Sequence, residues 1–87
     1  MRREHVLEGN HILEVIQLED NKIAYMIMCI EKFADAYRIK GQEAFNYLHK
    51  HNGLKFLDSH YKAEHLLSLE DAIDDLAAVC RNNGGNL

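Results

Sequence analysis

The chain has 87 residues, with 10 Lys and Arg against 14 Asp and Glu, 6 His, 2 Cys and neither Pro nor Trp. This length allows one small domain, and an apolar share of 47% is that of an ordinary globular chain, not a disordered one. The longest apolar stretch has eight residues, far short of the ~20 that a membrane-spanning helix needs, and no signal peptide is evident, so we expect a cytoplasmic protein with reduced thiols and no membrane segment.

The absence of Pro favours helices over a turn-rich β architecture. Residues 1–20 are ambiguous, because their apolar residues fit either a strand or a helix. We favour a helix, in which Ile12 and Ile16 continue the apolar spacing found further along the chain. A helix that projects from so small a domain would pair with another protein or with a second copy of the chain. The alternative is that this segment folds back over the core of its own domain.

The clearest element is a predicted helix over residues 22–37. Its apolar residues recur at steps of three and four, which is the spacing of one helix face, and Asp20 or Asn21 can cap its first turn. The predicted inner face consists of Ile23, Met26, Ile27, Ile30, Phe33, Ala34 and Tyr37.

Two shorter helices are predicted next, over residues 42–50 and residues 54–60. Asn52 and Gly53 separate them, because both residue types tolerate the left-handed conformation that ends a helix. The predicted inward residues are Ala44, Phe45 and Leu48 in the first of these helices and Leu54 and Leu57 in the second.

The last predicted helix begins after Ser68. Ser68 and Asp71 approximate a capping box, in which the serine oxygen accepts a hydrogen bond from a backbone N–H of the first turn. The predicted inner stripe consists of Leu69, Ile73, Leu76, Ala77 and Cys80. Gly84 and Gly85 then end the helix.

These elements predict an all-α fold, a small bundle of about four helices over residues 21–82. An extension over residues 1–20 could mediate oligomerisation, and residues 83–87 would form a disordered tail. The net charge is +3 over residues 38–62 and −4 over residues 63–87. A solvated surface with local ion pairs explains this pattern more simply than a nucleic-acid site, which needs a concentrated basic surface.

No combination of side chains predicts a metal centre, a cofactor site or a catalytic site. The histidines lack the paired short spacings of zinc ligands, and Cys29 and Cys80 fall on apolar stripes, where buried thiols are ordinary. Ser59 and His60 are neighbours only in sequence, which does not give the geometry of a nucleophile and its base. We therefore expect no enzyme, no cofactor and no metal.

His65 can hydrogen-bond to a neighbouring backbone carbonyl, and Tyr61, four residues earlier, can contact it across the turn. Short runs of residues around this pair form a recognisable pattern. They are Cys29, Ile30, Glu31, Phe33 and Ala34, then Gly41, Glu43, Ala44, Phe45 and Leu48, then Gly53, Leu54, Phe56 and Leu57, then Tyr61 and His65, and finally Glu70, Asp71 and Ile73. In this pattern the chain resembles a family of short bacterial proteins of unknown function, the one numbered thirty-seven ninety-one. Lys40 stands where we expect a small hydroxyl residue, and Leu66 where we expect a polar one.

The resemblance covers about two-thirds of the chain and includes no catalytic motif. It implies a small helical protein. Some members of the family are encoded beside ADP-ribosyltransferase-like proteins of toxin type, which implies a protein-binding or antitoxin-like accessory role. Tyr61 and His65 match the family at polar positions, so the resemblance makes them candidates for a specific surface or a specific turn.

We therefore predict a non-enzymatic protein-interaction module or antitoxin-like accessory protein, which binds another protein or forms a homo-oligomer. Its candidate interaction residues are Ile12, Val15, Ile16, Tyr61 and His65. The alternative is a small helical nucleic-acid-binding regulator that uses the basic segment over residues 38–62, with the helix over residues 42–50 as its recognition helix. Its candidate contacts are Arg38, Lys40, Lys50, Lys55 and Lys62.

Overall fold

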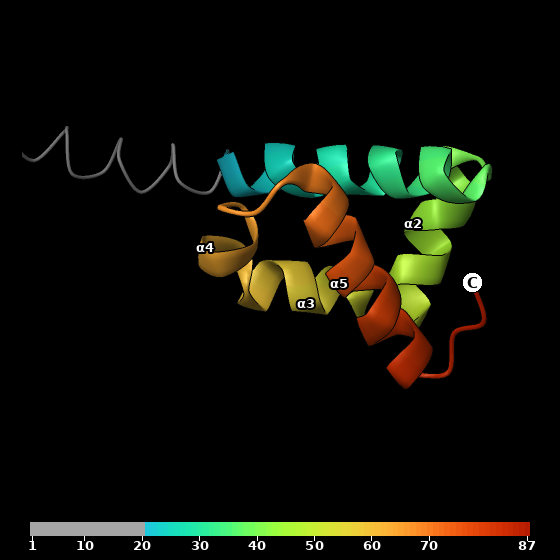
Figure 1. Cartoon of the computed structure of the whole chain (residues 1–87). Coiled ribbons are helices and arrows are strands. Elements are labelled where there is room, and N and C mark those ends of the chain that lie inside the picture. The colour runs from blue at the N-terminus through green and yellow to red at the C-terminus, as the bar shows by residue number, and fades with distance from the viewer. Residues whose placement is uncertain (1–20) are drawn as a thin grey trace, which may run out of the picture.

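The structure is a computed structural model and describes residues 21–87 (Figure 1). Within that range it is all-α, as predicted, with five helices and no strand. The helices are the first helix over residues 21–37, α2 (Gly41–Lys50), α3 (Gly53–Ser59), α4 (Tyr61–Glu64) and α5 (Leu69–Asn82). The helix predicted over residues 1–20 lies outside the described residues. In the described range no helix is long and apolar enough to cross a membrane.

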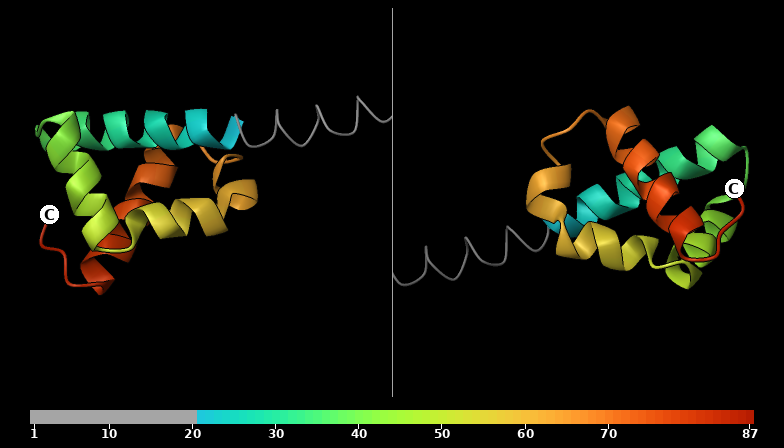
Figure 2. Two further views of the ribbon diagram at one scale, coloured as in Figure 1. Left: turned by 180° about the vertical axis from the view of Figure 1, so that it is seen from behind. Right: turned by 60° about the horizontal axis from the view of Figure 1, so that its bottom comes forward.

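The helices form a frame that α5 crosses. The first helix runs along one side, α2 leaves its far end at a steep angle, and α3 returns toward the beginning of the first helix (Figure 1). Helix α4 stands at that end, and α5 then crosses the frame diagonally, as both views in Figure 2 show. The core lies inside this frame, where Phe33, Leu48, Leu57 and Leu76 are fully buried.

The first helix confirms the element predicted over residues 22–37. Its buried residues are Cys29, Phe33 and Ala34, and Tyr25, Met26, Ile30 and Tyr37 pack against the core while partly buried. Two residues of the predicted inner face are placed differently, because Ile23 is 56% exposed and Ile27 is 49% exposed. The buried face is centred on Cys29 and Phe33. The apolar part of this helix's surface is wider than the part that the other helices cover. The spacing of the apolar residues alone could therefore not define the buried side.

Helix α2 confirms the helix predicted over residues 42–50. Ala44 and Leu48 are buried, but Phe45 is 42% exposed, so its predicted inward position is wrong. Each helical residue is rotated by about 100° from the one before it, and this rotation carries Phe45 off the line that Ala44 and Leu48 form. The Phe45 ring lies parallel to the ring of His49 instead.

Asn52 and Gly53, at the junction between α2 and α3, have different roles. Asn52 has the left-handed conformation that we predicted, with a φ of 67°. Gly53 is instead the first residue of α3 and is buried. A Cβ atom on Gly53 would lie 2.9 Å from Cys80 Sγ, 3.0 Å from Leu48 Cδ2 and 3.1 Å from Leu76 Cδ1. A glycine is therefore required at this position by the close approach of α2, α3 and α5, and not by the conformation of the turn.

Helix α3 differs by one residue at each end from the helix predicted over residues 54–60. Leu57 is fully buried and Leu54 is partly buried, as predicted. Helix α4 follows at once and was not predicted, because four residues are too few for an apolar repeat to indicate a helix. It lies beside the beginning of the first helix (Figure 1).

Helix α5 begins after Ser68, as predicted. The backbone N–H of Asp71 donates a hydrogen bond to Ser68 Oγ at 3.1 Å, which satisfies one of the free N–H groups of the first turn. The predicted inner stripe is also confirmed. Ile73, Leu76, Ala77 and Cys80 are buried, and Leu69 is partly buried.

The last residues, 83–87, lie against the domain, where the sequence predicts a disordered tail. Gly84 has a φ of 90° and turns the chain after α5. The backbone N–H of Leu87 then donates to the Tyr47 hydroxyl at 3.1 Å, and the Leu87 side chain packs against the core. The glycines end the helix as predicted, but the chain after them returns to α2.

Candidate functional site

Tyr61 and His65, the two predicted interaction residues in the described range, meet at α4. Their rings are stacked, with centroids 4.6 Å apart, and His65 Nδ1 donates to the Tyr61 carbonyl at 2.8 Å. A carbonyl oxygen only accepts, so this contact places the proton on Nδ1. Tyr25 of the first helix packs edge-on against Tyr61, with ring centroids 5.5 Å apart. Tyr61 is only 9% exposed, so its ring joins α4 to the first helix.

Four histidines of the described range lie four residues after an aromatic residue and contact its ring. The pairs are Phe45 and His49, Tyr47 and His51, Phe56 and His60, and Tyr61 and His65, with ring centroids between 4.6 and 6.1 Å apart. Residues four apart lie on one helix face, so each ring reaches the other. His60 also places Nδ1 3.2 Å from the Phe56 carbonyl. The rings of His60 and His65 therefore give the Phe56 and Tyr61 carbonyls a second hydrogen bond, beside the one from the histidine backbone N–H. Only the pair at Tyr61 was predicted from the sequence.

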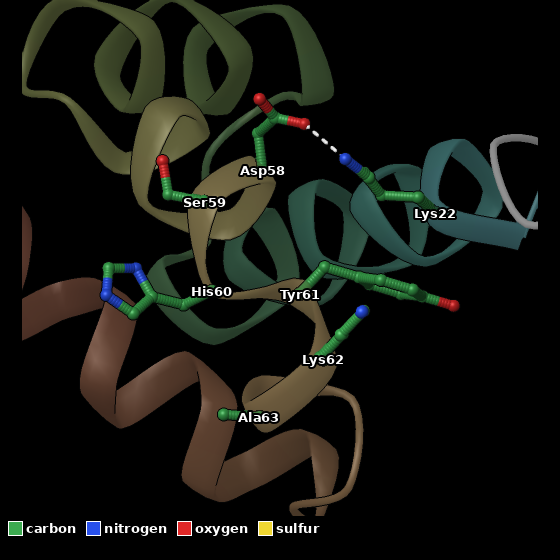
Figure 3. Close-up of a pocket in the computed structure, with 7 residues that line it drawn as sticks. All are labelled: Lys22, Asp58, Ser59, His60, Tyr61, Lys62 and Ala63. Atoms are coloured by element: carbon green, nitrogen blue, oxygen red, sulfur yellow. Dashed lines mark hydrogen bonds and ion pairs between the residues drawn. The ribbon is translucent and has the colours of Figure 1, made fainter.

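An open hollow of about 470 Å³ lies beside Tyr61 (Figure 3). Lys22 of the first helix and residues 58–63 line it. Lys22 Nζ and Asp58 Oδ1 are 2.8 Å apart, and this ion pair joins the first helix to α3. Because the pair is exposed to solvent, it contributes about 0–1 kcal/mol to stability.

Ser59 and His60 both line the hollow but do not form a nucleophile and its base. The Ser59 hydroxyl and the His60 ring point in different directions in Figure 3, and His60 Nδ1 is already bound to a backbone carbonyl. A general base must reach the proton of its nucleophile, so this pair does not support nucleophilic catalysis.

Polar side chains from three helices meet under α4, in what we call the polar corner: Tyr25, Cys29, Tyr61, Glu64 and Asp75. Glu64 is only 6% exposed. Its Oε1 and the Tyr25 hydroxyl are both enclosed and have no hydrogen-bond partner in the described part of the chain. Burial, together with the hydrogen bond and the charge of Asp75, raises the pKa of Glu64 to about 7. No sequence pattern points to Glu64, because a single glutamate in a polar stretch is typical of a solvated surface.

Cys29 and Cys80 are free and fully buried, which confirms their predicted positions on apolar stripes. Burial raises the pKa of both thiols. The thiolate is the nucleophilic form of cysteine, so neither environment promotes reaction. Within the range that the structure describes, no three His, Cys, Asp or Glu side chains are placed to hold a metal ion.

The predicted interaction residues Ile12, Val15 and Ile16 lie outside the described residues. The helix that follows them exposes a different apolar surface, which we call the outer face. It consists of Ile23, Ala24, Ile27 and Met28. Its three large side chains are between 49% and 56% exposed. Leu66 and Leu67, between α4 and α5, are exposed as well. Neither surface was predicted, because apolar residues at helical spacing were assigned to the core.

The structure does not gather the cations of the nucleic-acid alternative at one place. All of them are exposed: Arg38, Lys40, Lys50, Lys55 and Lys62. Arg38 and Lys40 lie between the first helix and α2, whereas Lys62 lies in α4, at the opposite end of the domain (Figure 1). Glu43 Oε1 also accepts from the Lys40 backbone N–H at 2.8 Å, which puts a carboxylate at the start of the supposed recognition helix. A phosphate-binding surface needs cations on one face, so no observation favours this alternative.

Comparison with known proteins gives a family for this fold and no activity. No curated protein and no solved structure matches the sequence significantly. Residues 24–83 match the family model described as Protein of unknown function (DUF3791), which extends from the first helix through α5. The chain therefore belongs to the DUF3791 family of proteins of unknown function, which confirms the resemblance seen in the sequence.

Proposed function

We propose that this protein is a non-enzymatic protein-interaction module that binds a second copy of itself through the outer face of its first helix. The observation that carries the proposal is the exposure of three large apolar side chains on one side of one helix. Single apolar residues are common on protein surfaces, but neighbouring ones on a helix face are typical of contact with another protein. The second copy would supply the helix that covers them.

The outer face is suited to a two-fold contact between identical helices. In an antiparallel crossing, Ile23 would lie opposite Met28 of the second copy, and Ala24 opposite Ile27 of the second copy. The small Ala24 side chain would leave room for the larger one that faces it. A two-fold interface uses the same patch on both copies, so one self-complementary face is sufficient.

The outer face alone is too small for a stable dimer. Such an interface buries roughly 800 Å² on each partner, which three half-exposed side chains do not supply. We therefore include Ile12 and Ile16 in the proposed interface. They precede Ile23 by eleven and seven residues, and in the helix predicted over residues 1–20 both intervals would return to the face of Ile23.

Sedimentation velocity of the full chain tests the proposal, and we expect a dimer. The double variant Ile23→Glu and Ile27→Glu should be monomeric, because it places charges in an apolar contact. Its helical content should be unchanged, since both side chains are exposed within the protomer. The matched control is Phe45→Glu, at an exposed apolar residue of α2, which should leave the dimer intact. A full chain that stays monomeric, or a double variant that still dimerises, overturns the proposal.

The double variant Ile12→Glu and Ile16→Glu tests the extension of the interface in the same experiment. We expect it to weaken the dimer, because these residues would supply the area that the outer face lacks. The antitoxin-like role that the family resemblance implies would require a different protein as partner. A full chain that is monomeric alone and forms a stoichiometric complex with a toxin-type protein would favour that role over self-association.

A further inference from the structure

Glu64 is the one charged residue that is buried in the described part of the chain. It belongs to α4, a helix of only four residues. Its Oε1 and the Tyr25 hydroxyl are enclosed there without hydrogen-bond partners among the described residues. A carboxylate that is removed from water and not compensated is costly, so the polar corner favours the neutral acid.

Groups from three helices face Glu64. They are Tyr25 and Cys29 of the first helix, His60 and Tyr61 at the start of α4, and Asp75 of α5. Asp75 is an acid within hydrogen-bonding reach of the Glu64 carboxyl. His60 is the one neighbour that can become cationic, and its Nδ1 is already bound to a backbone carbonyl. In the described range, no lysine or arginine forms an ion pair with Glu64.

We propose that the polar corner is a pH-sensitive latch. In its neutral form, the Glu64 carboxyl donates a hydrogen bond to the Asp75 carboxylate and so holds α4 between the first helix and α5. At higher pH the Glu64 proton passes to water, and the buried Glu64 carboxylate then faces the carboxylate of Asp75, which is an exposed residue. Their repulsion and the cost of burying the new charge release α4, which carries Tyr61 away from Tyr25.

The pH range of this latch follows from the chemistry of a buried acid. Burial, and then the hydrogen bond and the charge of Asp75, raise the pKa of Glu64 from 4.5 to about 7. Between these values the closed protein holds a proton that the open protein has lost. The open fraction therefore rises as the pH increases from 4.5 to about 7 and is constant above that range.

Cys29 provides a probe for the position of α4. Its thiol is fully buried beside Tyr25, and Tyr25 packs against Tyr61 of α4. Release of α4 would therefore uncover Cys29. Cys80 is equally buried but packs against Gly53 of α3, so its labelling reports on opening of the packed core, which the latch does not require.

The test is the rate at which dithiodipyridine, a thiol reagent that works in mild acid, labels each cysteine of the full chain between pH 5 and pH 8. Mass spectrometry separates the two sites. We expect the Cys29 rate of the unmodified protein, divided by the Cys29 rate of the Glu64→Gln variant at the same pH, to rise by up to about tenfold per pH unit and to level off near pH 7. Glu64→Gln keeps the shape of the side chain but cannot ionise, so dividing by its Cys29 rate removes the pH dependence of the thiol and of the other titrating groups. Cys29 should also react faster than Cys80, because Cys80 is exposed only when the packing around it opens.

Two variants of α5 sharpen the result. Asp75→Asn removes the facing charge and keeps Glu64, so the rise should level off at a lower pH. Asp74→Asn is the matched control at an exposed neighbour and should keep the profile of the unmodified protein. A divided Cys29 rate that stays constant with pH, or a Cys29 rate that does not exceed the Cys80 rate, overturns the proposal.

Discussion

Helices α2, α3 and α5 meet in what we call the packed corner, formed by Leu48, Gly53, Leu76 and Cys80, whereas α4 meets the first helix and α5 in the polar corner. The side chains of the packed corner are fully buried and apolar, and a single methyl group on Gly53 would be too close to all three. The polar corner contains two enclosed oxygen atoms without partners in the described range. Close packing thus holds α2, α3 and α5 together in the packed corner, whereas the position of α4 in the polar corner depends on the protonation of Glu64. Regions of low and high local stability can coexist in one small fold.

The largest expected effect comes from breaking the core that both corners share. Phe33 is fully buried, and its ring centroid lies 4.5 Å from that of Tyr37 and 5.7 Å from that of Tyr47. Phe33→Ala should lower the free energy of unfolding by about 3–5 kcal/mol, as measured by urea denaturation followed by circular dichroism. Such a loss would unfold much of the protein, because small domains have little stability to spare.

Phe45→Ala is the matched control, because Phe45 is an exposed phenylalanine of α2. It should cost less than ~1 kcal/mol. Similar losses for both variants would show that the structure places the first helix or α2 in the wrong rotation.

A smaller effect tests the packed corner itself. Gly53→Ala adds a methyl group within 3.1 Å of three side chains, so we expect it to lower the free energy of unfolding by about 1–3 kcal/mol. Gly41→Ala is the matched change, since Gly41 also begins a helix and has nothing within 4 Å of an added Cβ. It should raise the free energy of unfolding by about 0.4–1 kcal/mol, because alanine reduces the entropy of the unfolded chain. Thermal denaturation of both variants would measure the difference, and stabilisation by Gly53→Ala would show that the packed corner has free space.

The longer helices were predictable because each combines an apolar repeat with a local signal for its ends. Ser68 caps α5 through its own side chain, and Asn52 adopts the left-handed conformation that its residue type tolerates. Such signals depend on neighbours in sequence, so they can be interpreted without the fold. The inner stripe of α5 was correct for the same reason, since its polar residues define the opposite face.

The rotation of the first helix could not be predicted in this way. Ile23 and Cys29 are both apolar, and only the positions of the other helices decide that Cys29 is buried and Ile23 is exposed. The polar corner was also beyond sequence analysis. Glu64 and Asp75 are eleven residues apart, and their meeting depends on the turn that reverses the chain between α4 and α5. The candidate site therefore depends on tertiary contacts, whereas most of the helices depend on local pattern.

The smallest expected effect concerns the histidines beside the polar corner. His65 stacks on Tyr61 and donates to its carbonyl at 2.8 Å. His65→Ala should therefore lower the free energy of unfolding by about 0.5–1.5 kcal/mol, the usual contribution of one hydrogen bond. The ring centroids of His49 and Phe45 are 6.1 Å apart, and the His49 ring forms no hydrogen bond in the described part of the chain. His49→Ala should therefore stay within ~0.5 kcal/mol of the unmodified protein.

Hydrogen exchange distinguishes a local loss from a global one at His65. If the two corners are separate, His65→Ala should speed amide exchange in α4 and leave exchange in the second half of α5, around Cys80, almost unchanged. Cys80 belongs to the packed corner, whose residues come from α2, α3 and α5 and not from α4. Equal acceleration in α4 and around Cys80 would mean that the polar corner opens only when the whole domain unfolds. The two corners would then form one cooperative unit, and the contrast between them would be limited to their chemistry.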